Sequence, residues 1–474
     1  MSAFYISAAH KSSGKTTLSI GLVRAYANRG LMVQPFKKGP DYIDPIWHGQ
    51  ASGNPCYNLD FNTQSAEQIL ATYGQHMQAA RLGLVEGNIG LFDGMDLQGS
   101  NSNAAMAKLL GLPVILVINC QGMTRGIAPL LLGYQAFDTE VNFAGVILNR
   151  VGGSRHERKL IEVVEHYTDI PVLGSVHQDP DLQIVERHLG LIPGNEEAGA
   201  ETLIARLASR VEEQVDLDRL LGIADLVSKP VLPVVNGISN PVDEKYSGLR
   251  IGLAKDRAFG FYYPDDLERF LSLGVELVEF DTLNDSQLPD VDGLFLGGGF
   301  PETAMDALQH NSTMRRSVAE FIEKGGPVYA ECGGLIYLTR TLTWNGKQCR
   351  MAGVIPADTV MHEKPKGRGY VRLRETGRSH WPSVQTEPGD TIPAHEFHYS
   401  SLEGLEAKDD EFAYEVVRGY GIDGKHDGYI YKNLLASYTH MRSVGGNDWV
   451  RRFVAQVAAE KDVQAASKVQ VSDV

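Results

Sequence analysis

Short apolar runs alternate with stretches of helical periodicity through the first half of the chain. The runs predict strands at residues 4–8, 32–36, 82–86, 114–119, 144–149 and 172–176. Helical patterns lie between most of them, for example at residues 15–28 and 127–137. Strands that are apolar on both faces and alternate with helices are typical of a parallel sheet covered on each side by helices.

A second series of strands begins near residue 249, after a stretch that contains several prolines and glycines and is typical of a linker. It predicts strands at residues 249–254, 275–280, 293–296, 328–330, 393–398 and 435–438. The chain is therefore expected to be an α/β protein. We expect a first domain at 1–227, a linker at 228–248, a second domain at 249–460 and a flexible tail at 461–474.

Composition and charge exclude some classes of binding partner and agree with the two-domain α/β prediction. The 474 residues are 43% hydrophobic and 22% charged, which is ordinary for a globular protein. The net charge is −15 and no long run of lysine and arginine is present, which argues against nucleic acid or an anionic membrane as a partner. A small anionic ligand remains compatible, because a few lysines and a helix N-terminus are enough to bind it.

The four cysteines have no CxxC spacing and no density suggestive of a disulfide framework. The first strand runs straight into a functional loop, so we expect no signal peptide. No uncharged apolar stretch approaches the roughly 18–20 residues of a membrane span. We expect a cytoplasmic protein with small-molecule substrates, and the possibility of a homodimer stays open.

A phosphate-binding loop follows the first strand, in the string AHKSSGKTT at residues 9–17. Strand, loop and helix follow one another as in a Walker A motif, although Ala9 replaces the usual first glycine. Lys15 is expected to reach the β- and γ-phosphates of a nucleotide, and the Thr16 hydroxyl to ligate Mg²⁺. The residues expected to bind the nucleotide in this loop are Ser13, Gly14, Lys15, Thr16 and Thr17.

Acidic side chains follow the next two predicted strands. Asp41 and Asp44 lie in PFKKGPDYIDP, and Glu86 and Asp93 lie in EGNIGLFDG. In an open parallel sheet, ligands bind at the carboxyl ends of the strands, so these side chains should meet the phosphate loop at one edge. The plainer alternative is that Asp41 and Asp44 only cap turns around two prolines.

Cys332 lies in PVYAECGGLIY, where a strand, a sharp turn and a helix follow one another. This arrangement exposes a nucleophile at a helix N-terminus and favours its thiolate. His440, about a hundred residues later in ASYTH, ends a predicted strand and is the expected base. Oxyanion donors are expected from the backbone of Gly298 and Gly299.

Two further histidines offer an alternative base. His395 and His398 lie in HEFHYS on a predicted strand. Their spacing could also suggest a metal site, but no other residue supports one, so a structural or substrate-contact role is preferred.

Nine strings in this order resemble the cobyrinic acid a,c-diamide synthase family over nearly the whole chain. They are GKTT, KGPDYIDP, EGNIGLFDG, GVILNRVG, ERHLGLIP, GGGFPE, ECGG, HEFHYS and ASYTH. The first domain is similar to dethiobiotin synthetase, and the second to class I glutaminases.

The resemblance implies a glutamine- and ATP-dependent amidation of a tetrapyrrole carboxylate through an acyl phosphate. It implies that Thr16, Glu86 and Asp41 bind Mg²⁺, and that Asn149 reads the adenine. It assigns the substrate and the acyl phosphate to Lys37, Lys38, Asp41, Asp44 and Asp93.

One departure concerns the glutaminase. Many class I glutaminases carry a glutamate two residues after the histidine, whereas this chain has Arg442 there. The branch that it resembles uses a Cys–His pair, and what orients His440 stays open. The tetrapyrrole that accepts the amide also stays open. The strings HKSSGKTT and FDGMDLQGSNSN are more similar to the relatives that amidate sirohaem.

A different class of function is a P-loop ATPase that acts as a nucleotide-switched scaffold. Such a protein would need a tether or a partner surface, and the chain shows neither a basic patch nor an amphipathic tail. It would also have no use for the cysteine at the predicted elbow. A binding module with a dead glutaminase is disfavoured by the intact Cys332 and His440.

Overall fold

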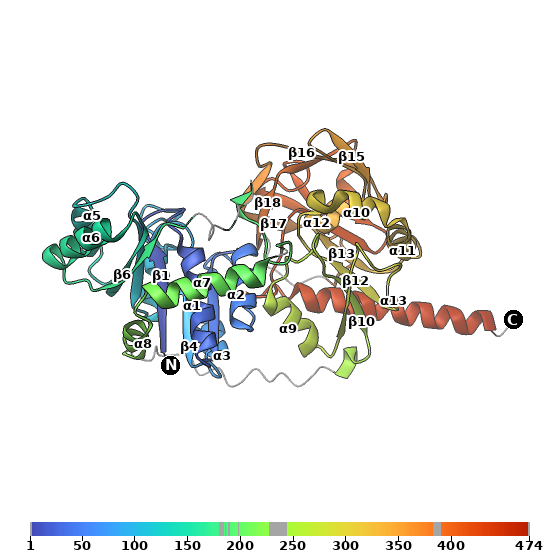
Figure 1. The fold of residues 1–474 in the computed structure, drawn as a ribbon. Helices are drawn as coiled ribbons and strands as arrows, with labels where there is room; N and C mark the ends of the chain where they lie inside the picture. Colours follow the sequence, from blue (N-terminus) through green and yellow to red (C-terminus); the bar gives the residue numbers. More distant parts are fainter. Residues whose placement is uncertain are drawn as a thin grey trace. The chain divides into compact units, whose positions relative to one another are not determined.

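The computed structural model describes residues 2–179, 184, 186–187, 190–197, 199–226, 244–382 and 390–472. The chain divides into two compact units, Met1–Ile238 and Ser239–Val474 (Figure 1). The division falls within residues 228–248, predicted as a linker, although residues 227–243 lie outside the described part of the chain. The exact domain limits stay a prediction.

The first unit is built on a seven-stranded sheet with the order β3-β2-β4-β1-β5-β6-β7. Every neighbouring pair in it is parallel, as the apolar pattern predicted. Its strands are β1 (Ser2–Ala8), β2 (Val33–Lys38), β3 (Tyr57–Leu59), β4 (Leu82–Glu86), β5 (Val114–Asn119), β6 (Phe143–Val151) and β7 (Val172–His177), with a separate pair β8 (Glu186–Arg187) and β9 (Gly190–Leu191).

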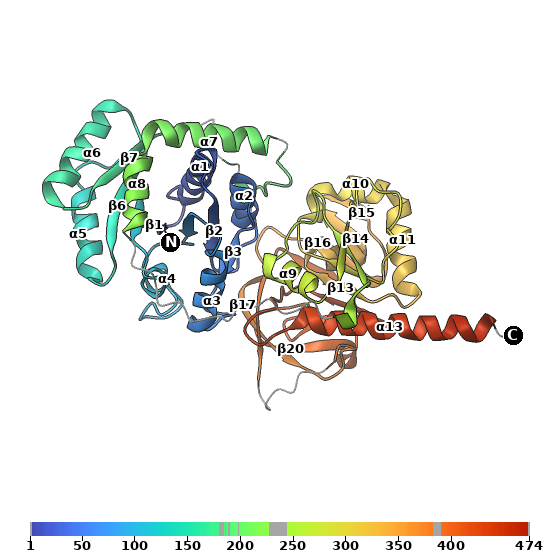
Figure 2. The same cartoon turned by 90° about the horizontal axis from the view of Figure 1, so that it is seen from below.

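Helices cover both faces of this sheet. They are α1 (Lys15–Asn28), α2 (Ile43–Ser52), α3 (Ala66–His76), α4 (Asn103–Leu110), α5 (Ile127–Phe137), α6 (Ser154–Tyr167), α7 (Ala200–Gln214) and α8 (Leu217–Asp225). Helix α1 packs against α7, and α5 against α6, as Figures 1 and 2 both show. Strand β1 serves a core on each face, because Phe4 and Ile6 enter one and Ala3 and Tyr5 the other. This explains why its sequence is apolar without alternation.

The second unit contains a nine-stranded sheet with the order β11-β10-β12-β13-β22-β21-β20-β17-β18. The first five strands in this order are parallel and the remainder are antiparallel. They are β10 (Arg250–Ala254), β11 (Glu276–Phe280), β12 (Gly293–Leu296), β13 (Val328–Glu331), β17 (Gly367–Glu375), β18 (Ile392–His398), β20 (Phe412–Arg418), β21 (His426–Tyr431) and β22 (Leu434–Ser437).

A smaller sheet, with the order β15-β14-β16-β19, completes the strands described in this unit. Its strands are β14 (Thr339–Trp344), β15 (Lys347–Arg350), β16 (Ile355–Met361) and β19 (Ser400–Glu403). The α-helices described in this unit are α9 (Pro264–Ser272), α10 (Met305–His310), α11 (Ser312–Glu323), α12 (Gly333–Leu338) and α13 (Trp449–Ser472), and short 3₁₀ turns lie at η2 (Glu244–Tyr246), η3 (Pro301–Ala304) and η4 (Asp409–Glu411).

Helix α13 extends into the segment after residue 460 that is expected to be a flexible tail. It continues without a break to Ser472. The sequence after 460 contains alanine, lysine and glutamine, which are strong helix formers, and lacks proline and glycine up to that residue. Among the helices of the described residues, none combines the length and the apolar character that a membrane crossing requires.

Candidate active sites

The phosphate loop of the first unit joins β1 to α1 in a strained conformation. Gly14 precedes α1 with φ 86°, and Ser12 has φ 61°. The Asn149 side chain, from β6, donates from Nδ2 to the carbonyl of Ser13 at 2.8 Å. A Cβ atom at Gly14 would lie 2.2 Å from that Nδ2, so glycine is required here both for its φ and for space.

Lys15 begins α1 and is buried. Burial, followed by the charge of Lys37, lowers the pKa of its ammonium. Its positive charge is therefore costly without an anion beside it, which is suited to a site that receives phosphate.

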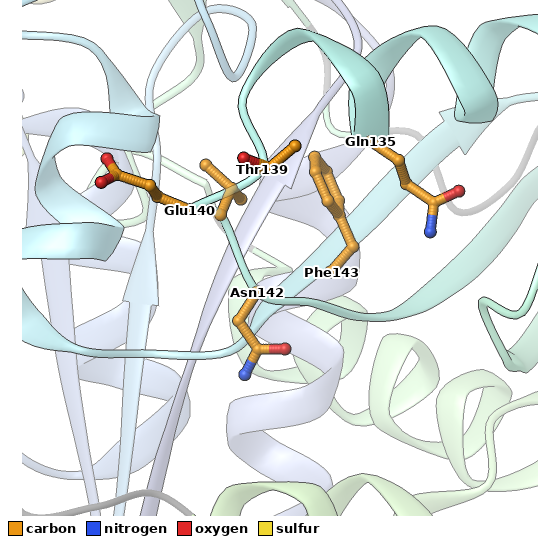
Figure 3. Close-up of a pocket in the computed structure, with 6 residues that line it drawn as sticks. Gln135, Thr139, Glu140, Asn142 and Phe143 are labelled. Carbon is orange, nitrogen blue, oxygen red and sulfur yellow. The ribbon is translucent and has the colours of Figure 1, made fainter.

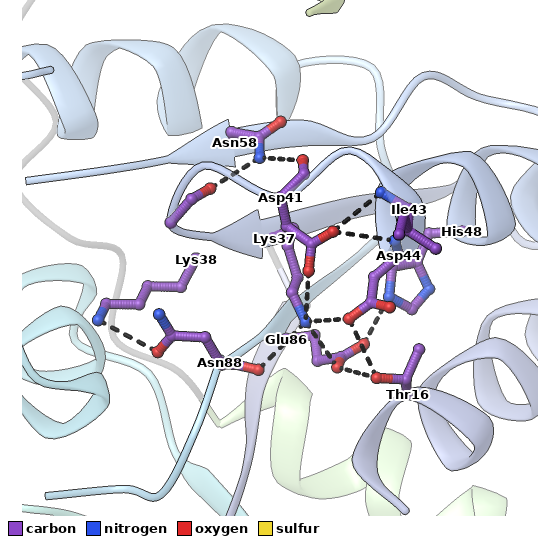
Figure 4. Close-up of polar contacts among 12 residues, drawn as sticks. Thr16, Lys37, Lys38, Asp41, Ile43, Asp44, His48, Asn58, Glu86 and Asn88 are labelled. Atoms are coloured by element: carbon purple, nitrogen blue, oxygen red, sulfur yellow. Dashed lines mark hydrogen bonds and ion pairs between the residues drawn. The ribbon is translucent and has the colours of Figure 1, made fainter. Parts of the chain in front are cut away.

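Four side chains from separate elements meet around the Lys37 ammonium at the carboxyl end of β2 (Figure 4). Lys37 Nζ lies 2.5 Å from Asp44, 2.9 Å from Glu86 and 3.8 Å from Asp41. The Thr16 hydroxyl donates to Glu86 at 2.7 Å and to Asp44 at 3.1 Å. The structure thus brings Asp41, Asp44 and Glu86 together with Thr16 of the phosphate loop, as the strand-end argument predicted, whereas Asp93 bonds the Gly90 backbone.

Charges within this cluster move its pKa values in opposite directions. Burial alone would raise the pKa of Glu86, but Lys37 and His48 outweigh it and hold that pKa below the usual range. Burial and then repulsion from Asp44 raise the pKa of Asp41 to about 7. Asp41 still has 33% of its side chain exposed, so solvent moderates its interactions more than those of Glu86.

His48 was not predicted from the sequence. It is fully buried, and its Nε2 lies 2.5 Å from Glu86 Oε2. It follows Asp44 by four residues on α2, so both lie on one helix face, and that spacing was the signal available in the sequence.

Three further predicted residues, Lys38, Asp93 and Thr17, have their own surroundings. Lys38 Nζ contacts Asn88 at 3.3 Å, and burial lowers its pKa to about 8. Asp93 accepts from the Gly90 backbone at 3.0 Å. Burial, followed by the charge of Asp93, raises the pKa of Tyr134, whose hydroxyl donates to the Ala9 carbonyl. Thr17 follows Thr16 in the first turn of α1.

The donor set suits Mg²⁺. No group of three or more histidine, cysteine, aspartate or glutamate side chains within the described residues has metal-binding geometry. Here the Lys37 ammonium occupies the position of a cation among three carboxylates and contacts two of them closely. A threonine hydroxyl and one or two carboxylates, completed by phosphate oxygens and water, are typical Mg²⁺ ligands.

A hollow elsewhere in the first unit has no such chemistry. It measures about 420 Å³ and lies where α5 ends and β6 begins, lined by Gln135, Thr139, Glu140, Val141, Asn142 and Phe143 (Figure 3). It is at the amino end of β6, whereas Asn149 and the phosphate loop are at the carboxyl end. It therefore adds nothing to the nucleotide site.

The predicted elbow of the second unit is present. Cys332 links β13 to α12 with φ 46° and ψ −97°, and the residue is 7% exposed. Its N–H donates to the Ser437 carbonyl at 2.7 Å, and the Gly334 N–H to the Gly297 carbonyl at 3.0 Å. A Cβ atom at Gly334 would stand 2.1 Å from the Leu296 carbonyl oxygen, so glycine permits this tight turn.

His440 lies against this elbow and is buried. Its Nδ1 is 3.2 Å from Glu331 Oε2. Burial would lower the pKa of His440, but its hydrogen bonds to Cys332 and Glu331 outweigh burial and raise that pKa to about 10. Because Nδ1 of His440 faces Glu331, Nε2 is the ring nitrogen that can bond the Cys332 sulfur.

Gly298 and Gly299 lie beside both residues. A Cβ atom at Gly298 would be 2.5 Å from His440 Cε1, and one at Gly333 would be 2.9 Å from the Gly299 nitrogen. The backbone of this strand end therefore lines the space next to Cys332, where donors for an oxyanion were predicted.

The other two histidines have different surroundings. His395 exchanges backbone hydrogen bonds with His440 at 2.7 and 3.2 Å, and burial together with the His440 charge lowers its pKa to about 3. His398 stacks on Tyr438 at 3.9 Å, and its Nδ1 is 2.9 Å from the Ser400 carbonyl. These contacts favour the structural interpretation over an alternative base.

Arg442, at the position where many class I glutaminases have a glutamate, binds other groups. Its guanidinium is 2.6 Å from Asp265 and lies over the ring of Tyr263. The carboxylate beside the histidine comes instead from Glu331, which was not predicted from the sequence. Its only signal was its place directly before the elbow cysteine.

The two folds and their sites define a glutamine amidotransferase that carries its own nucleotide-binding domain. Residues 6–192 match a CobQ/CobB/MinD/ParA nucleotide binding domain, and residues 250–447 match a CobB/CobQ-like glutamine amidotransferase domain. The chain belongs to the cobyrinate a,c-diamide synthase family, as its motifs predicted. Its activity is a glutamine-dependent, ATP-driven amidation.

Relatives that carry the name cobyrinate a,c-diamide synthase match nearly the full chain. The protein of Magnetococcus marinus is 45% identical over 447 residues, covering 94% of this chain and 95% of its own. That of Methanosarcina acetivorans is 40% identical over 463 residues, covering 93% and 92%. Among solved structures, PurLQS from Thermotoga maritima has 16% identity and covers 45% of this chain and 98% of its own, and its TM-score of 0.34 is too low to add to the assignment.

Proposed function

We propose that this protein converts the a and c acetate side chains of cobyrinate to amides, with glutamine as the nitrogen source and ATP as the activator. The observation that carries this proposal is the 45% identity that spans both units. The relatives described above are named for cobyrinate, which favours this acceptor over sirohaem. The identity across the second unit also favours a synthetase over a nucleotide-switched scaffold.

In the first unit, a substrate carboxylate oxygen would attack the γ-phosphorus of ATP. The bond between that phosphorus and the bridging oxygen breaks, which yields an acyl phosphate and ADP. Lys15 and the loop N–H groups would neutralise and orient the phosphates, and Asn149 would face the nucleotide base. Ammonia then attacks the acyl carbon and phosphate leaves, which gives the amide.

Mg²⁺ would be held by Thr16, Glu86 and Asp41, and it would supply charge neutralisation between the carboxylate and the phosphates. Lys37 and Lys38 would bring in the substrate carboxylate, with Asp44 holding Lys37 in place at 2.5 Å. Asp93, beside the start of the phosphate loop, would border the acyl phosphate.

In the second unit, the Cys332 thiolate would attack the carboxamide carbon of glutamine. Gly298 and Gly299 would stabilise the oxyanion, and His440 would protonate the departing ammonia. Water, deprotonated by His440, then hydrolyses the glutamyl thioester to glutamate and restores the thiol group.

The test is an amidation assay on cobyrinate and a panel of other carboxylated tetrapyrroles, with product masses read after incubation with ATP and glutamine. We expect two amides on cobyrinate. ATP hydrolysis without amidation of any tetrapyrrole would refute the proposal, and amidation of sirohaem alone would replace the acceptor. The Cys332→Ala variant should use free ammonia but not glutamine, and continued use of glutamine would show that Cys332 is not the nucleophile.

A further inference from the structure

We propose that Glu331 is the positioning residue of the glutaminase site, because its carboxylate accepts the Nδ1–H of His440 and holds the ring with Nε2 towards Cys332. The inference rests on the proposed glutaminase roles of Cys332 and His440. It assigns the third member of the site to the residue that directly precedes the nucleophile, in place of a residue that follows the histidine.

The Glu331 carboxylate is fixed on three sides. It ends β13 and is 2% exposed. Oε2 lies 3.2 Å from His440 Nδ1, while Oε1 accepts from the Tyr329 hydroxyl at 2.6 Å and from the Met441 N–H at 2.9 Å. Two bonds to one oxygen thus orient the other oxygen towards the imidazole, and one of them comes from the residue next to His440.

The other charged groups nearby have different roles. Cys332 and His395 also face the His440 ring, and His395 is neutral because burial and the His440 charge lower its pKa to about 3. The Glu331 charge also acts on Asp266, Tyr262, Tyr329 and Tyr414, and burial raises the pKa of all four. Glu331 is thus the group whose side chain bonds Nδ1.

A buried carboxylate is stable only beside a positive or hydrogen-bonding partner. The His440 ring supplies the positive partner, since its pKa is raised to about 10 despite burial. A protonated imidazole between a carboxylate and a thiol favours the thiolate form of the cysteine. Glu331 therefore acts on Cys332 through His440, and it fixes which ring nitrogen carries the proton towards the sulfur.

During the reaction Glu331 would form and break no bond to the substrate. The thiolate electron pair forms the bond from sulfur to the carboxamide carbon, and the bond from that carbon to nitrogen breaks. The proton on His440 Nε2 moves to the leaving ammonia, and the Nδ1–H remains with the ring. Without the carboxylate, the neutral imidazole can adopt the wrong tautomer and its protonated form loses its partner.

The test compares Glu331→Gln with the parent in two assays of the full chain, amidation driven by glutamine and amidation driven by free ammonia. The amide keeps the size of the side chain and an oxygen for Tyr329 and Met441, but it removes the charge. We expect kcat with glutamine to fall on the order of 100-fold or more. Ammonia-driven kcat should stay within about 2-fold, because the first unit needs no glutaminase.

The pH dependence of Cys332 alkylation shows whether Glu331 positions His440 or only stabilises the fold. In Glu331→Gln, the rate of Cys332 alkylation by iodoacetamide should shift its dependence to higher pH, because the thiolate loses the protonated imidazole. Alkylation at Cys332 is isolated by subtracting the signal of Cys332→Ala. Glu331→Asp keeps the charge with a shorter reach and should restore part of the glutamine-driven rate.

A matched control is Asp427→Asn. Asp427 is also buried, and its oxygens accept from the Tyr438 and Thr439 backbones at 3.0 Å rather than from the imidazole. The Asp427→Asn variant should have lower thermal stability but an unchanged pH dependence of Cys332 alkylation. A Glu331→Gln variant with an unchanged profile and an unchanged glutamine-driven rate would overturn the proposal. Equal losses with glutamine and ammonia would also overturn it, whereas failure of the glutaminase role itself would show in Cys332→Ala.

Discussion

The two sites are built on different physical principles. At the strand ends of the first unit, charged side chains from β2, β4 and α2 converge and are held by ion pairs, and the Thr16 hydroxyl of α1 is hydrogen-bonded to them. At the elbow of the second unit, a strained backbone places Cys332, and one carboxylate orients its base. The first arrangement is held by charge, whereas the second is held by backbone geometry and is assembled without glutamine.

This difference predicts the largest effect for Lys15→Met. The phosphate loop serves both nitrogen sources, so glutamine- and ammonia-driven amidation should fall together, on the order of 1,000-fold. Steady-state rates with each nitrogen source measure this. Glutamine hydrolysis should persist in the variant, and its loss would contradict the independence of the two sites.

The next largest effect is expected for Lys37→Met. Removal of the ammonium leaves the carboxylates of Asp44 and Glu86 buried without their main partner, so the free energy of unfolding should fall by about 3 kcal/mol. Chemical denaturation followed by fluorescence measures it. Added Mg²⁺ should recover part of the loss, because a cation can replace the ammonium among these oxygens. A variant as stable as the parent, with no response to Mg²⁺, would argue against a cation-binding cluster.

The Gly298→Ala variant perturbs the glutaminase site of the second unit sterically, without changing any charge. The new Cβ would lie 2.5 Å from His440 Cε1, so the ring must move. A displacement of this kind should lower glutamine-driven kcat on the order of 100-fold, while ammonia-driven amidation continues. Gly346→Ala is a control of stability alone, because a Cβ there meets no atom within 4 Å, although its φ is 75°. Equal loss with both nitrogen sources would point to misfolding instead.

The smallest effects concern pH, and the two units should respond in different windows. The folded pKa of His440 is about 10 against an ordinary 6.5, so its stabilising contribution is complete below 6.5 and is lost as pH rises towards 10. The folded pKa of Asp41 is about 7 against an ordinary 3.8, so the stabilising contribution of its protonated form is complete below 3.8 and is lost as pH rises towards 7. His440→Gln and Asp41→Asn should each flatten the dependence of unfolding free energy on pH in its own window. An unchanged slope in either variant would contradict that assignment.

Much of the first unit could be predicted from its sequence. Strands β4 and β5 and helices α1 and α5 have the limits that the apolar pattern predicted. A parallel sheet buried on both faces leaves continuous apolar runs, which are easy to recognise. The convergence of Asp44 and Glu86 was also predictable, since it follows from strand direction alone.

The antiparallel part of the second unit was harder to predict. Strand β17 reads GRGYVRLRE, and only alternate residues such as Val371 and Leu373 are fully buried. Its charged positions resemble those of a surface loop. The roles of Glu331 and His48 depend on the partners that the fold brings to them from other elements, Glu86 for His48 and His440 for Glu331, and the local sequence does not specify those partners.

The position of Glu331 directly before Cys332 has a mechanical consequence. The nucleophile and the anchor of its base are carried on consecutive peptide units, so any displacement of β13 moves both in step. The position of Glu331 relative to Cys332 therefore changes little when the strand moves. A site whose anchor lay on a distant loop would have to restore that alignment after every motion of the loop.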